Sequence, residues 1–453
     1  MKNRGKNSLP GTVTSSVQSV RERLLEVLAS FPPARRYWVA YSGGLDSHVL
    51  LHSLAALRDR LPVGALNAVH VDHGLSPHAG EWSQHCATVC ERLDIPLTLL
   101  QVDARPRRGE SPEAAARRAR YAALAPLIGE GEGLLTAHHQ DDQAETVLLQ
   151  LLRGSGPRGL AAMPCWDSFG SGWRGRPLLG VERARLRAYA EAEGLHWVED
   201  ESNFDTGVAR NYLRHEIVPR LRERWPAMAV TLSRAAGHAA EAARLLDDLA
   251  ERDMVTAGDG GLEIEPLRGL EVARRRNLLR YWIRVSGFPL PDSAHLQRIL
   301  DEVIPAAKDA SPRVLWRGAE VRRYRNRLYV MPPLKPFDSS RVLTWKPDEP
   351  LALPDGRVLR AVPVLGQGIA RARCRDARVT VRFRRGGERC RPAGSAHTRS
   401  LKKLLQERGI PPWERERLPL LYVGEELAAV VGLFVCEPFP ARQGEAGWHV
   451  TLA

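Results

Sequence analysis

The chain has 453 residues, which is too long for one ordinary hydrophobic core and predicts two to four domains. Apolar residues make up 43% of it and charged residues 26%, a balance that is typical of folded proteins and excludes wholesale disorder. The formal net charge of +13 specifies no fold, but it favours a polyanionic partner.

Cysteine content and hydropathy exclude several further classes. The six cysteines include no Cys-x-x-Cys pair, which argues against a disulfide scaffold or a zinc ribbon. The first twenty residues contain no apolar segment of the kind found in a secretory signal. The longest apolar run, 427–436, is half the length needed to span a bilayer. We therefore expect a soluble, cytoplasmic protein with no membrane partner.

The region from about residue 36 to residue 152 alternates short apolar strands with amphipathic helices. We expect strands at 37–41, 66–71, 97–102 and 134–137, and helices at 46–60, 78–93, 113–128 and 141–152. This alternation with short connections predicts an α/β domain with a doubly wound, Rossmann-like parallel sheet covered on both faces. Ligands of such sheets bind beyond the carboxyl ends of the strands.

The rest of the chain has a different pattern. Its middle region predicts helices at 227–257, 271–285 and 293–304, then a short β pattern at 314–330. Residues 331–353 are Pro-rich and are interpreted as a linker. The last part predicts strands at 379–384, 420–423 and 427–433 and a helix at 400–408. We therefore expect three domains: 1–224, a mainly helical 225–345, and a small, basic α+β domain at 346–453.

Positive charge is concentrated near the C-terminus. Residues 371–417 contain 15 Lys or Arg and 5 Asp or Glu, a local net charge of +10. A solvated arginine-rich surface is one explanation. However, several cations lie beside aromatic residues in the sequence, and this combination favours contact with nucleic-acid phosphates and bases. The residues that we select for this contact are Arg382, Arg384, Arg385, Lys402 and Lys403.

A six-residue string follows the first expected strand: Ser42, Gly43, Gly44, Leu45, Asp46 and Ser47. The two glycines let the backbone approach a ligand closely, and the N-terminus of the next helix directs N–H groups at the same point. Asp46 suits a Mg²⁺ ion that bridges phosphate oxygens. The alternative is a plain glycine turn in which Asp46 or Ser47 caps the helix.

The string resembles the pyrophosphate loop of the N-type ATP pyrophosphatases, and it lacks the Gly-Lys-Ser/Thr ending of a Walker loop. Further segments resemble the tRNA(Ile)-lysidine synthetases, and together they extend over nearly the whole chain. These segments are 70–75, 113–121, 136–146, 153–160, 200–203, 210–214 and 401–413.

The resemblance implies a two-step ligation on tRNA. ATP adenylates the C2 oxygen of the wobble cytidine in a tRNA(Ile) with the anticodon CAU. The ε-amine of L-lysine then displaces AMP at that carbon and gives lysidine, so that the tRNA decodes AUA as Ile instead of AUG as Met. The implied substrates and cofactor are ATP, lysine, this tRNA and Mg²⁺, and homodimer formation is left open.

The same resemblance suggests roles for individual residues. Arg117 and His138 are expected to stabilise charge on the α-phosphate, beside Asp46 with its Mg²⁺. Asp142 and Glu145, three residues apart on one helical face, are expected to bind the lysine ammonium groups, whereas Asp141 is expected to act as a cap.

Three interpretations remain less specific. Arg210 and Arg214 could contact the anticodon loop or the AMP phosphate, or could form a solvated helix face. His70, Asp72 and His73 are placed near the adenine or ribose. A metal centre that joins these residues to His138 or His139 lacks the usual ligand spacing.

Two other functions compete with lysidine formation. A tRNA 2-thiolating enzyme also adenylates a base oxygen, but it needs catalytic cysteines or an iron–sulfur cluster, and Cys86-x-x-x-Cys90 is a poor match. A non-catalytic RNA-binding protein with a degenerate nucleotide fold would not need the intact loop at residues 42–47.

Overall fold

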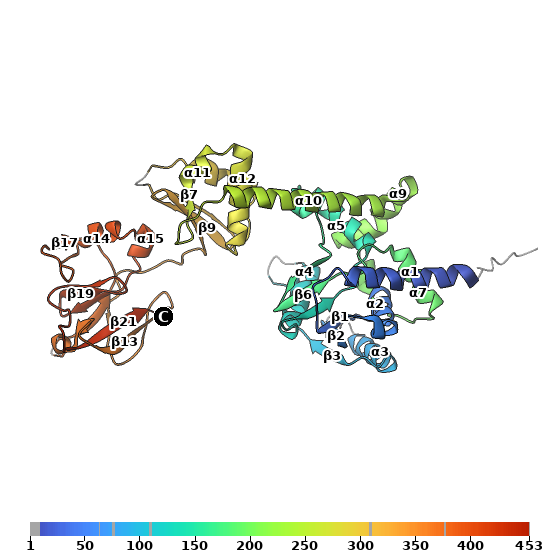
Figure 1. Cartoon of the computed structure of the whole chain (residues 1–453), viewed down its shortest axis with the longest axis horizontal. Coiled ribbons are helices and arrows are strands. Elements are labelled where there is room, and N and C mark those ends of the chain that lie inside the picture. Colours follow the sequence, from blue (N-terminus) through green and yellow to red (C-terminus); the bar gives the residue numbers. More distant parts are fainter. Residues whose placement is uncertain are drawn as a thin grey trace, which may run out of the picture. The chain divides into compact units, whose positions relative to one another are not determined.

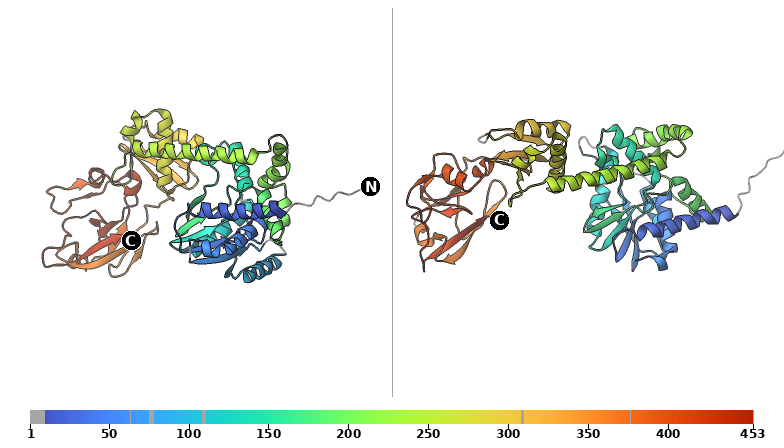
Figure 2. Two further views of the ribbon diagram at one scale, coloured as in Figure 1. Left: turned by 45° about the vertical axis from the view of Figure 1, so that its right-hand side comes forward. Right: turned by 45° about the horizontal axis from the view of Figure 1, so that its top comes forward.

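The computed structural model describes residues 10–62, 64–74, 78–107, 111–307, 310–375 and 377–452. It divides into two compact units, Met1–Leu245 and Leu246–Ala453, which are coloured from blue to yellow-green and from yellow-green to red in Figures 1 and 2.

The first unit is built around a six-stranded sheet. Its strands, in spatial order, are β3 (Leu97–Gln101), β2 (Ala65–Asp72), β1 (Arg36–Ala40), β4 (Glu132–Leu135), β6 (Gly172–Gly175) and β5 (Trp166–Phe169). All neighbouring strands are parallel except β5 and β6, which form an antiparallel hairpin at one edge. The expected parallel sheet is confirmed, and the hairpin is an addition that the sequence pattern did not indicate.

Helices cover both faces of this sheet (Figure 1). The helical segments are α1 (Pro10–Leu28), α2 (Leu45–Ala56), α3 (Ala79–Arg92), α4 (Pro112–Leu124), α5 (Gln140–Leu152), α6 (Pro157–Leu160), α7 (Arg183–Ala192), the 3-10 helix Glu201–Phe204, α8 (Ala209–Tyr212), the π-helix Leu213–Ile217 and α9 (Val218–Arg224). Residues of strand β1 point alternately to the two faces of the sheet. Tyr37 and Val39 pack in the core with α1, α2 and α7, whereas Trp38 packs on the other side with Leu124 of α4. This alternation follows from the two-residue period of a strand.

The order of the strands places the functional loops. β1 lies between β2 and β4, so the chain leaves β1 toward one side of the sheet and reaches β4 on the other. The loops that follow β1 and β4 therefore open a crevice at the carboxyl edge of the sheet, which is where doubly wound folds bind ligands.

The second unit begins within a long helix. α10 (Met228–Asp253) starts in the first unit, where Met228 and Ala229 pack with Ala144 and Val218. The expected boundary at 224/225 therefore precedes this helix, whereas the division into compact units falls after Leu245.

The first part of the second unit combines helices with a sheet. Its helices α11 (Ile264–Gly269), α12 (Val272–Val285) and α13 (Ser293–Arg298) pack on antiparallel strands in the order β7 (Leu262–Glu263), β10 (Arg327–Met331), β9 (Ala319–Tyr324) and β8 (Arg313–Trp316). Trp282 and Val321 lie in the shared core. The short β pattern expected at 314–330 thus belongs to a four-stranded sheet, which makes the region less helical than expected.

The C-terminal part contains two further sheets and a short hairpin. One sheet has the order β11 (Leu343–Thr344), β15 (Val379–Arg382), β18 (Leu420–Val423), β19 (Glu426–Val430) and β20 (Phe434–Val435). The other has the order β12 (Leu351–Ala352), β13 (Val358–Leu365), β21 (Ala446–Leu452) and β14 (Ile369–Ala370). The remaining elements are the hairpin of β16 (Arg389–Cys390) and β17 (Arg399–Ser400) and the helices α14 (Leu401–Glu407) and α15 (Pro412–Arg415).

The expected linker at 331–353 is partly absorbed into these sheets. Leu343 pairs with Val381, and Trp345 lies in the core of the C-terminal part. The expected boundary at 345/346 therefore falls directly after β11, at a residue of the folded C-terminal core. The reason is that a Pro-rich segment still supplies short edge strands, where proline costs few ladder hydrogen bonds.

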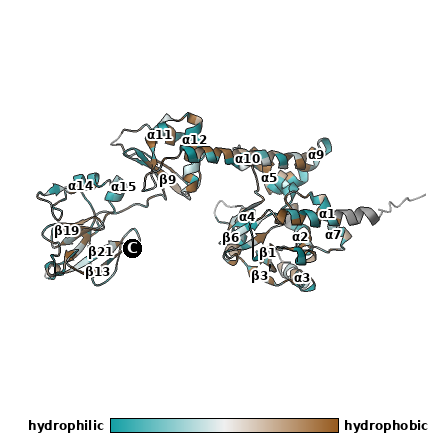
Figure 3. Cartoon of the chain, viewed as in Figure 1, coloured by the Kyte–Doolittle hydropathy of each residue, from teal (hydrophilic) through white to brown (hydrophobic). Residues whose placement is uncertain are grey.

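The hydropathy of the residues matches the arrangement of sheets and helices (Figure 3). Brown, apolar residues gather on the sheet strands, and α10 alternates between brown and teal along its length. In the part of the chain that the structure describes, no helix combines the length and the apolar character needed to cross a membrane.

Candidate active site

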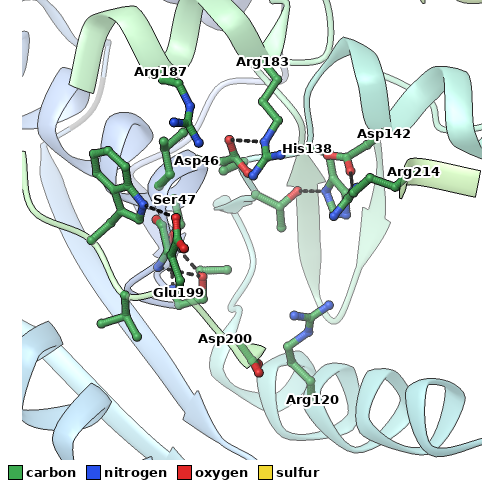
Figure 4. Close-up of a pocket in the computed structure, with 18 of the residues that line it drawn as sticks. Asp46, Ser47, Arg120, His138, Asp142, Arg183, Arg187, Glu199, Asp200 and Arg214 are labelled. Carbon is green, nitrogen blue, oxygen red and sulfur yellow. Dashed lines mark hydrogen bonds and ion pairs between the residues drawn. The ribbon is translucent and has the colours of Figure 1, made fainter. Parts of the chain in front are cut away.

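A cavity of about 420 Å³ lies at the carboxyl ends of β1 and β4 (Figure 4). Four acidic and four arginine side chains line it, together with residues of the loop after β1. The charged lining residues are Asp46, Asp142, Glu199, Asp200, Arg120, Arg183, Arg187 and Arg214. A cavity with both signs of charge can hold a phosphate ester at one place and an ammonium group at another.

The loop at residues 42–47 forms one wall of this cavity. Gly43 has φ +83°, a conformation that favours glycine, and a Cβ atom there would lie 3.1 Å from Sγ of Cys86, a tight contact. The carbonyl of Gly43 accepts a hydrogen bond from the backbone N–H of Val198 at 3.0 Å. The hydroxyls of Ser42 and Ser47 lie 3.0 Å apart. The turn is therefore fixed before any ligand binds.

The loop leads directly into α2, whose first residue is Leu45. The side chain of Leu45 is buried in the core, so only its backbone can serve a ligand. The first N–H groups of a helix have no partner within the helix, and the residues of this first turn line the cavity, so the site favours an anion such as a phosphate.

Asp46 is the charged residue of this loop. Its Oδ2 lies 3.6 Å from Nε2 of His139, and its Oδ1 lies 3.7 Å from Nε of Arg183 and accepts no hydrogen bond. A single pocket-facing carboxylate fits Mg²⁺, which usually takes one or two carboxylates besides phosphate oxygens and water. Among the described residues, no group of three or more His, Cys, Asp or Glu side chains is arranged to hold a metal ion by itself.

His139 connects this loop to the next wall and was not selected from the sequence. It is 1% exposed, and its Nδ1 accepts a hydrogen bond from the backbone N–H of Asp142 at 3.4 Å. Its Nε2 lies 3.6 Å from Asp46 and 3.4 Å from the carboxylate of Asp142. The structure contains a capping box here, with His139 and Asp142 in place of the Ser/Thr and Glu/Gln that mark this motif in a sequence, so the sequence carried only a weak signal.

His138 lines the cavity beside it. Its Nδ1 lies 2.9 Å from the hydroxyl of Thr136. Burial, reinforced by Arg176 and other arginines, lowers the pKa of His138 to about 3. This pKa favours a neutral imidazole that acts as a hydrogen-bonding group, and contact between His138 and the α-phosphate stays a prediction.

Asp142 and Glu145 share one arginine. Arg214 lies 2.9 Å from Asp142 and 2.7 Å from Glu145, and it contacts both oxygens of Glu145. Burial opposes ionisation of Asp142, but His139, His138 and Arg214 outweigh it and hold its pKa at about 2. Asp142 lines the cavity, whereas Glu145 is buried behind it. Contact between either residue and lysine stays a prediction, and the geometry favours Asp142.

Two neighbours complete this charged wall. Arg210 lies 3.8 Å from Glu145 and donates a hydrogen bond to the hydroxyl of Thr146 at 2.8 Å. Asp141 accepts a hydrogen bond from the backbone N–H of Arg183 at 2.9 Å. Asp141 therefore satisfies the first turn of α7 rather than that of its own helix α5, which is capped by His139 and Asp142. Arg210 and Arg214 are held by carboxylates within the protein.

The arginines of α4 occupy different positions. Arg120 and Tyr121 line the cavity, whereas Arg117 is exposed outside its lining. The guanidinium groups of Arg117, Arg120 and Arg174 lie 5.0, 5.2 and 4.7 Å from the centre of the Tyr121 ring. One turn of helix therefore separates the predicted phosphate ligand, Arg117, from the arginine that faces the pocket.

The residues at the end of β2 lie outside the cavity lining. Nδ1 of His70 lies 3.0 Å from the carbonyl oxygen of Tyr41 and 3.4 Å from Sγ of Cys86. Asp72 accepts a hydrogen bond from the backbone N–H of Gly74 at 2.8 Å. Burial lowers the pKa of His73. These contacts explain His70 and Asp72 as structural groups, and their role beside the nucleotide stays a prediction.

The basic residues near the C-terminus, all in the second unit, fall into two groups. Arg382 forms an ion pair with Glu425 at 2.7 Å, and Arg384 lies 3.8 Å from Glu388. Arg385 is exposed and donates a hydrogen bond to a backbone carbonyl, and the side chains of Lys402 and Lys403 on α14 are exposed. Only the second group offers cations that no carboxylate contacts within 4.0 Å among the described residues.

The parallel sheet, the glycine loop after β1 and the charged crevice define a PP-loop domain, the fold of a class of ATP-using enzymes. Residues 16–221 match the protein family described as "PP-loop domain". Residues 262–329 and 379–452 match "TilS substrate binding domain" and "TilS substrate C-terminal domain".

Similarity to whole proteins specifies the family. The chain is 46% identical over 433 residues to a tRNA(Ile)-lysidine synthase from Coxiella burnetii, with 95% of this chain and 96% of the relative covered. It is 47% identical over 408 residues to one from Methylococcus capsulatus, with 89% and 93% covered. The chain belongs to the tRNA(Ile)-lysidine synthase family.

Proposed function

We propose that the cavity at the carboxyl edge of the sheet adenylates the wobble cytidine of tRNA(Ile) with the anticodon CAU and then transfers L-lysine to it. The C2 oxygen attacks the α-phosphate of ATP, and the bond to the leaving diphosphate breaks. The ε-amine of lysine next forms a carbon–nitrogen bond at C2 and gives up a proton, while the carbon–oxygen bond to AMP breaks. The product is lysidine, which changes decoding from AUG to AUA and identity from Met to Ile.

One observation carries this proposal. Nε2 of His139 lies within 3.6 Å of both Asp46, in the phosphate loop, and Asp142, in the wall that faces it. An anion-binding turn and a carboxylate suited to an ammonium group therefore share one cavity. Such a cavity suits a reaction that joins a nucleotide and an amine at the same atom.

For the first step, residues 42–47 would bind the phosphates of ATP through backbone N–H groups and the hydroxyls of Ser42 and Ser47. Asp46 would hold Mg²⁺, which supplies charge neutralisation of the phosphate oxygens when it is bound. We assign the α-phosphate to Arg120 in place of Arg117, because Arg120 is the arginine of α4 that lines the cavity.

For the second step, Asp142 would bind an ammonium group of lysine. Glu145 would act indirectly: it contacts Arg214 through both oxygens and so fixes the arginine that Asp142 shares. Neutral His138, held by Thr136, would exchange a hydrogen bond with a reacting oxygen or amine.

The competing thiolation reaction finds no support in the cavity. Burial raises the pKa of Cys86 to about 12 and that of Cys90 to about 11, so neither thiol is a ready nucleophile. Neither cysteine is among the residues that line the cavity.

Trapping the intermediate tests the proposal. With α-³²P-labelled ATP, Mg²⁺ and the tRNA, but without lysine, we expect label on the tRNA; addition of lysine should release that label as AMP. A tRNA with uridine in place of the wobble cytidine is the matched control and should stay unlabelled. Release of AMP without any labelled tRNA, or equal labelling of the control, would refute the order of steps.

A further inference from the structure

Two aromatic side chains stack on each other at the cavity. Phe204 is the last residue of the 3-10 helix Glu201–Phe204, and His215 lies in the π-helix Leu213–Ile217. Their ring centroids are 5.6 Å apart, with 27° between the planes, which is a stacked arrangement. Both residues line the cavity that contains Asp46 and Asp142.

The packing of the protein does not account for the position of Phe204. Its side chain is 63% exposed, and it joins none of the apolar clusters formed by described residues of the first unit. One side of the ring is covered by His215, and most of the remaining ring surface faces solvent. An apolar ring presented in this way has a free π-face on which another planar group can stack.

The surroundings indicate the chemistry of that group. Arg214, which precedes His215 in sequence, is already paired with Asp142 and Glu145. Arg120 also lines the cavity, with its guanidinium 5.2 Å from the centre of the Tyr121 ring. No carboxylate lies within 4.0 Å of the Arg120 guanidinium among the described residues. Stacked aromatic rings beside an available cation, Arg120, match an unpaired nucleotide, whose base stacks and whose phosphate meets the positive charge.

We propose that Phe204 and His215 form a stacking subsite for the anticodon-loop base next to the wobble cytidine. This inference rests on the proposed function, because it is the cytidine that must leave the base stack to bring its C2 oxygen to the phosphate loop. The neighbouring base then loses a stacking partner. The exposed face of Phe204, at the same cavity, replaces that partner.

A binding experiment with the full chain tests this subsite. The probe is an anticodon stem-loop RNA with 2-aminopurine beside the wobble cytidine, because stacking on an aromatic ring quenches its fluorescence. We expect quenching by the wild type and by Phe204→Trp. Phe204→Ala should lose most of the quenching and bind the RNA about tenfold more weakly. The KM for ATP should stay within twofold.

The matched control is Trp225→Ala. Trp225 is 60% exposed in the same unit but lies outside the cavity lining, so its loss should leave both RNA binding and quenching unchanged. His215→Ala should reduce quenching less than Phe204→Ala does, since His215 supports the platform from behind.

Two outcomes with Phe204→Ala would overturn the inference. A raised KM for ATP in Phe204→Ala with unchanged RNA affinity would assign the ring to adenine instead. Unchanged affinity for both would make Phe204 an ordinary surface residue. Quenching needs no turnover, so a wild type that binds and quenches the RNA without making lysidine would refute the proposed function and leave the stacking subsite standing.

Discussion

At the scale of single residues, the site depends on how its charges are paired. Asp46 and Asp142 both face the cavity, and buried His139 lies between them. Asp142 also contacts Arg214, whereas Asp46 does not. Substitution of Asp142 therefore removes a partner from Arg214, and substitution of Asp46 does not. We therefore expect substitutions of Asp46 and of Asp142 to cause separable defects in catalysis.

For Asp46→Ala, we expect formation of adenylated tRNA to fall by a hundredfold or more, on the order of the loss of one transition-state charge contact. The affinity for tRNA should change by less than about twofold, because we assign Asp46 to the ATP phosphates and their Mg²⁺ and not to the RNA. Single-turnover labelling and filter binding measure the two quantities. Near wild-type labelling would remove Asp46 from the chemistry.

For Asp142→Asn, we expect the KM for lysine to rise about tenfold or more while the KM for ATP holds, since the amide removes the charge that attracts an ammonium group. Glu145→Gln should behave differently. It leaves Arg214 without its bidentate partner and should lower the free energy of unfolding by about 1–3 kcal/mol. Steady-state kinetics and thermal denaturation separate the two, and equal effects of Asp142→Asn on both KM values would indicate a structural role for Asp142.

At the scale of elements, α2 holds a buried histidine behind the phosphate loop. Burial, with smaller contributions from His85 and His52, lowers the pKa of His48 to about 4. The unfolded chain therefore binds one more proton than the folded chain between about pH 4 and the ordinary histidine pKa of about 6.5. The stability associated with neutral His48 is complete above pH 6.5 and is lost as the pH falls toward 4.

Accordingly, His48→Gln should flatten the pH dependence of stability in this window. The slope of the free energy of unfolding against pH should differ between wild type and variant by about 1.4 kcal/mol per pH unit, the value for one proton. Urea denaturation at a series of pH values provides the measurement, with exposed His238→Gln on α10 as the control. An unchanged slope for His48→Gln would mean that acid destabilisation arises elsewhere.

The same scale shows what sequence patterns can and cannot specify. The helix expected at 46–60 extends beyond the end of α2 at Ala56. Strands β1, β2 and β3 and the start of α2 were predicted to within one residue, because local periodicity and the glycine loop determine them. The hairpin of β5 and β6 was not, since its two four-residue strands carry a weak pattern and depend on β4 for pairing. For the site, sequence located the loops, whereas the choice of Arg120 over Arg117 and the sharing of Arg214 depend on tertiary contacts.

At the scale of the whole molecule, the excess charge is less available than its count suggests. Arg382 and Arg384 already contact Glu425 and Glu388, whereas the Lys402 and Lys403 side chains on α14 are exposed. Binding to tRNA phosphates releases counterions only for cations that make new contacts. The lysines should therefore contribute more to the salt dependence of binding than the paired arginines do.

We expect Lys402→Ala and Lys403→Ala each to weaken tRNA binding and to reduce the slope of log K against log salt by about 0.7–0.9 per lost contact. Arg382→Ala should change the slope less. Adenylation should recover at saturating tRNA in all three variants, because these residues lie outside the catalytic unit. Binding titrations across a salt series decide the matter, and an unaltered slope in the lysine variants would leave these side chains as a solvated surface.

The central claim is that one cavity joins ATP, lysine and a tRNA cytidine. Its most direct measurement is the amount of lysine joined to the CAU tRNA per molecule of AMP released, followed with radiolabelled lysine and ATP and located by mass spectrometry of the anticodon fragment. The account predicts one lysine per AMP, with all of the lysine on the wobble cytidine and none incorporated by Asp46→Ala. AMP release without lysine on the cytidine, or modification by another group at that base, would contradict it.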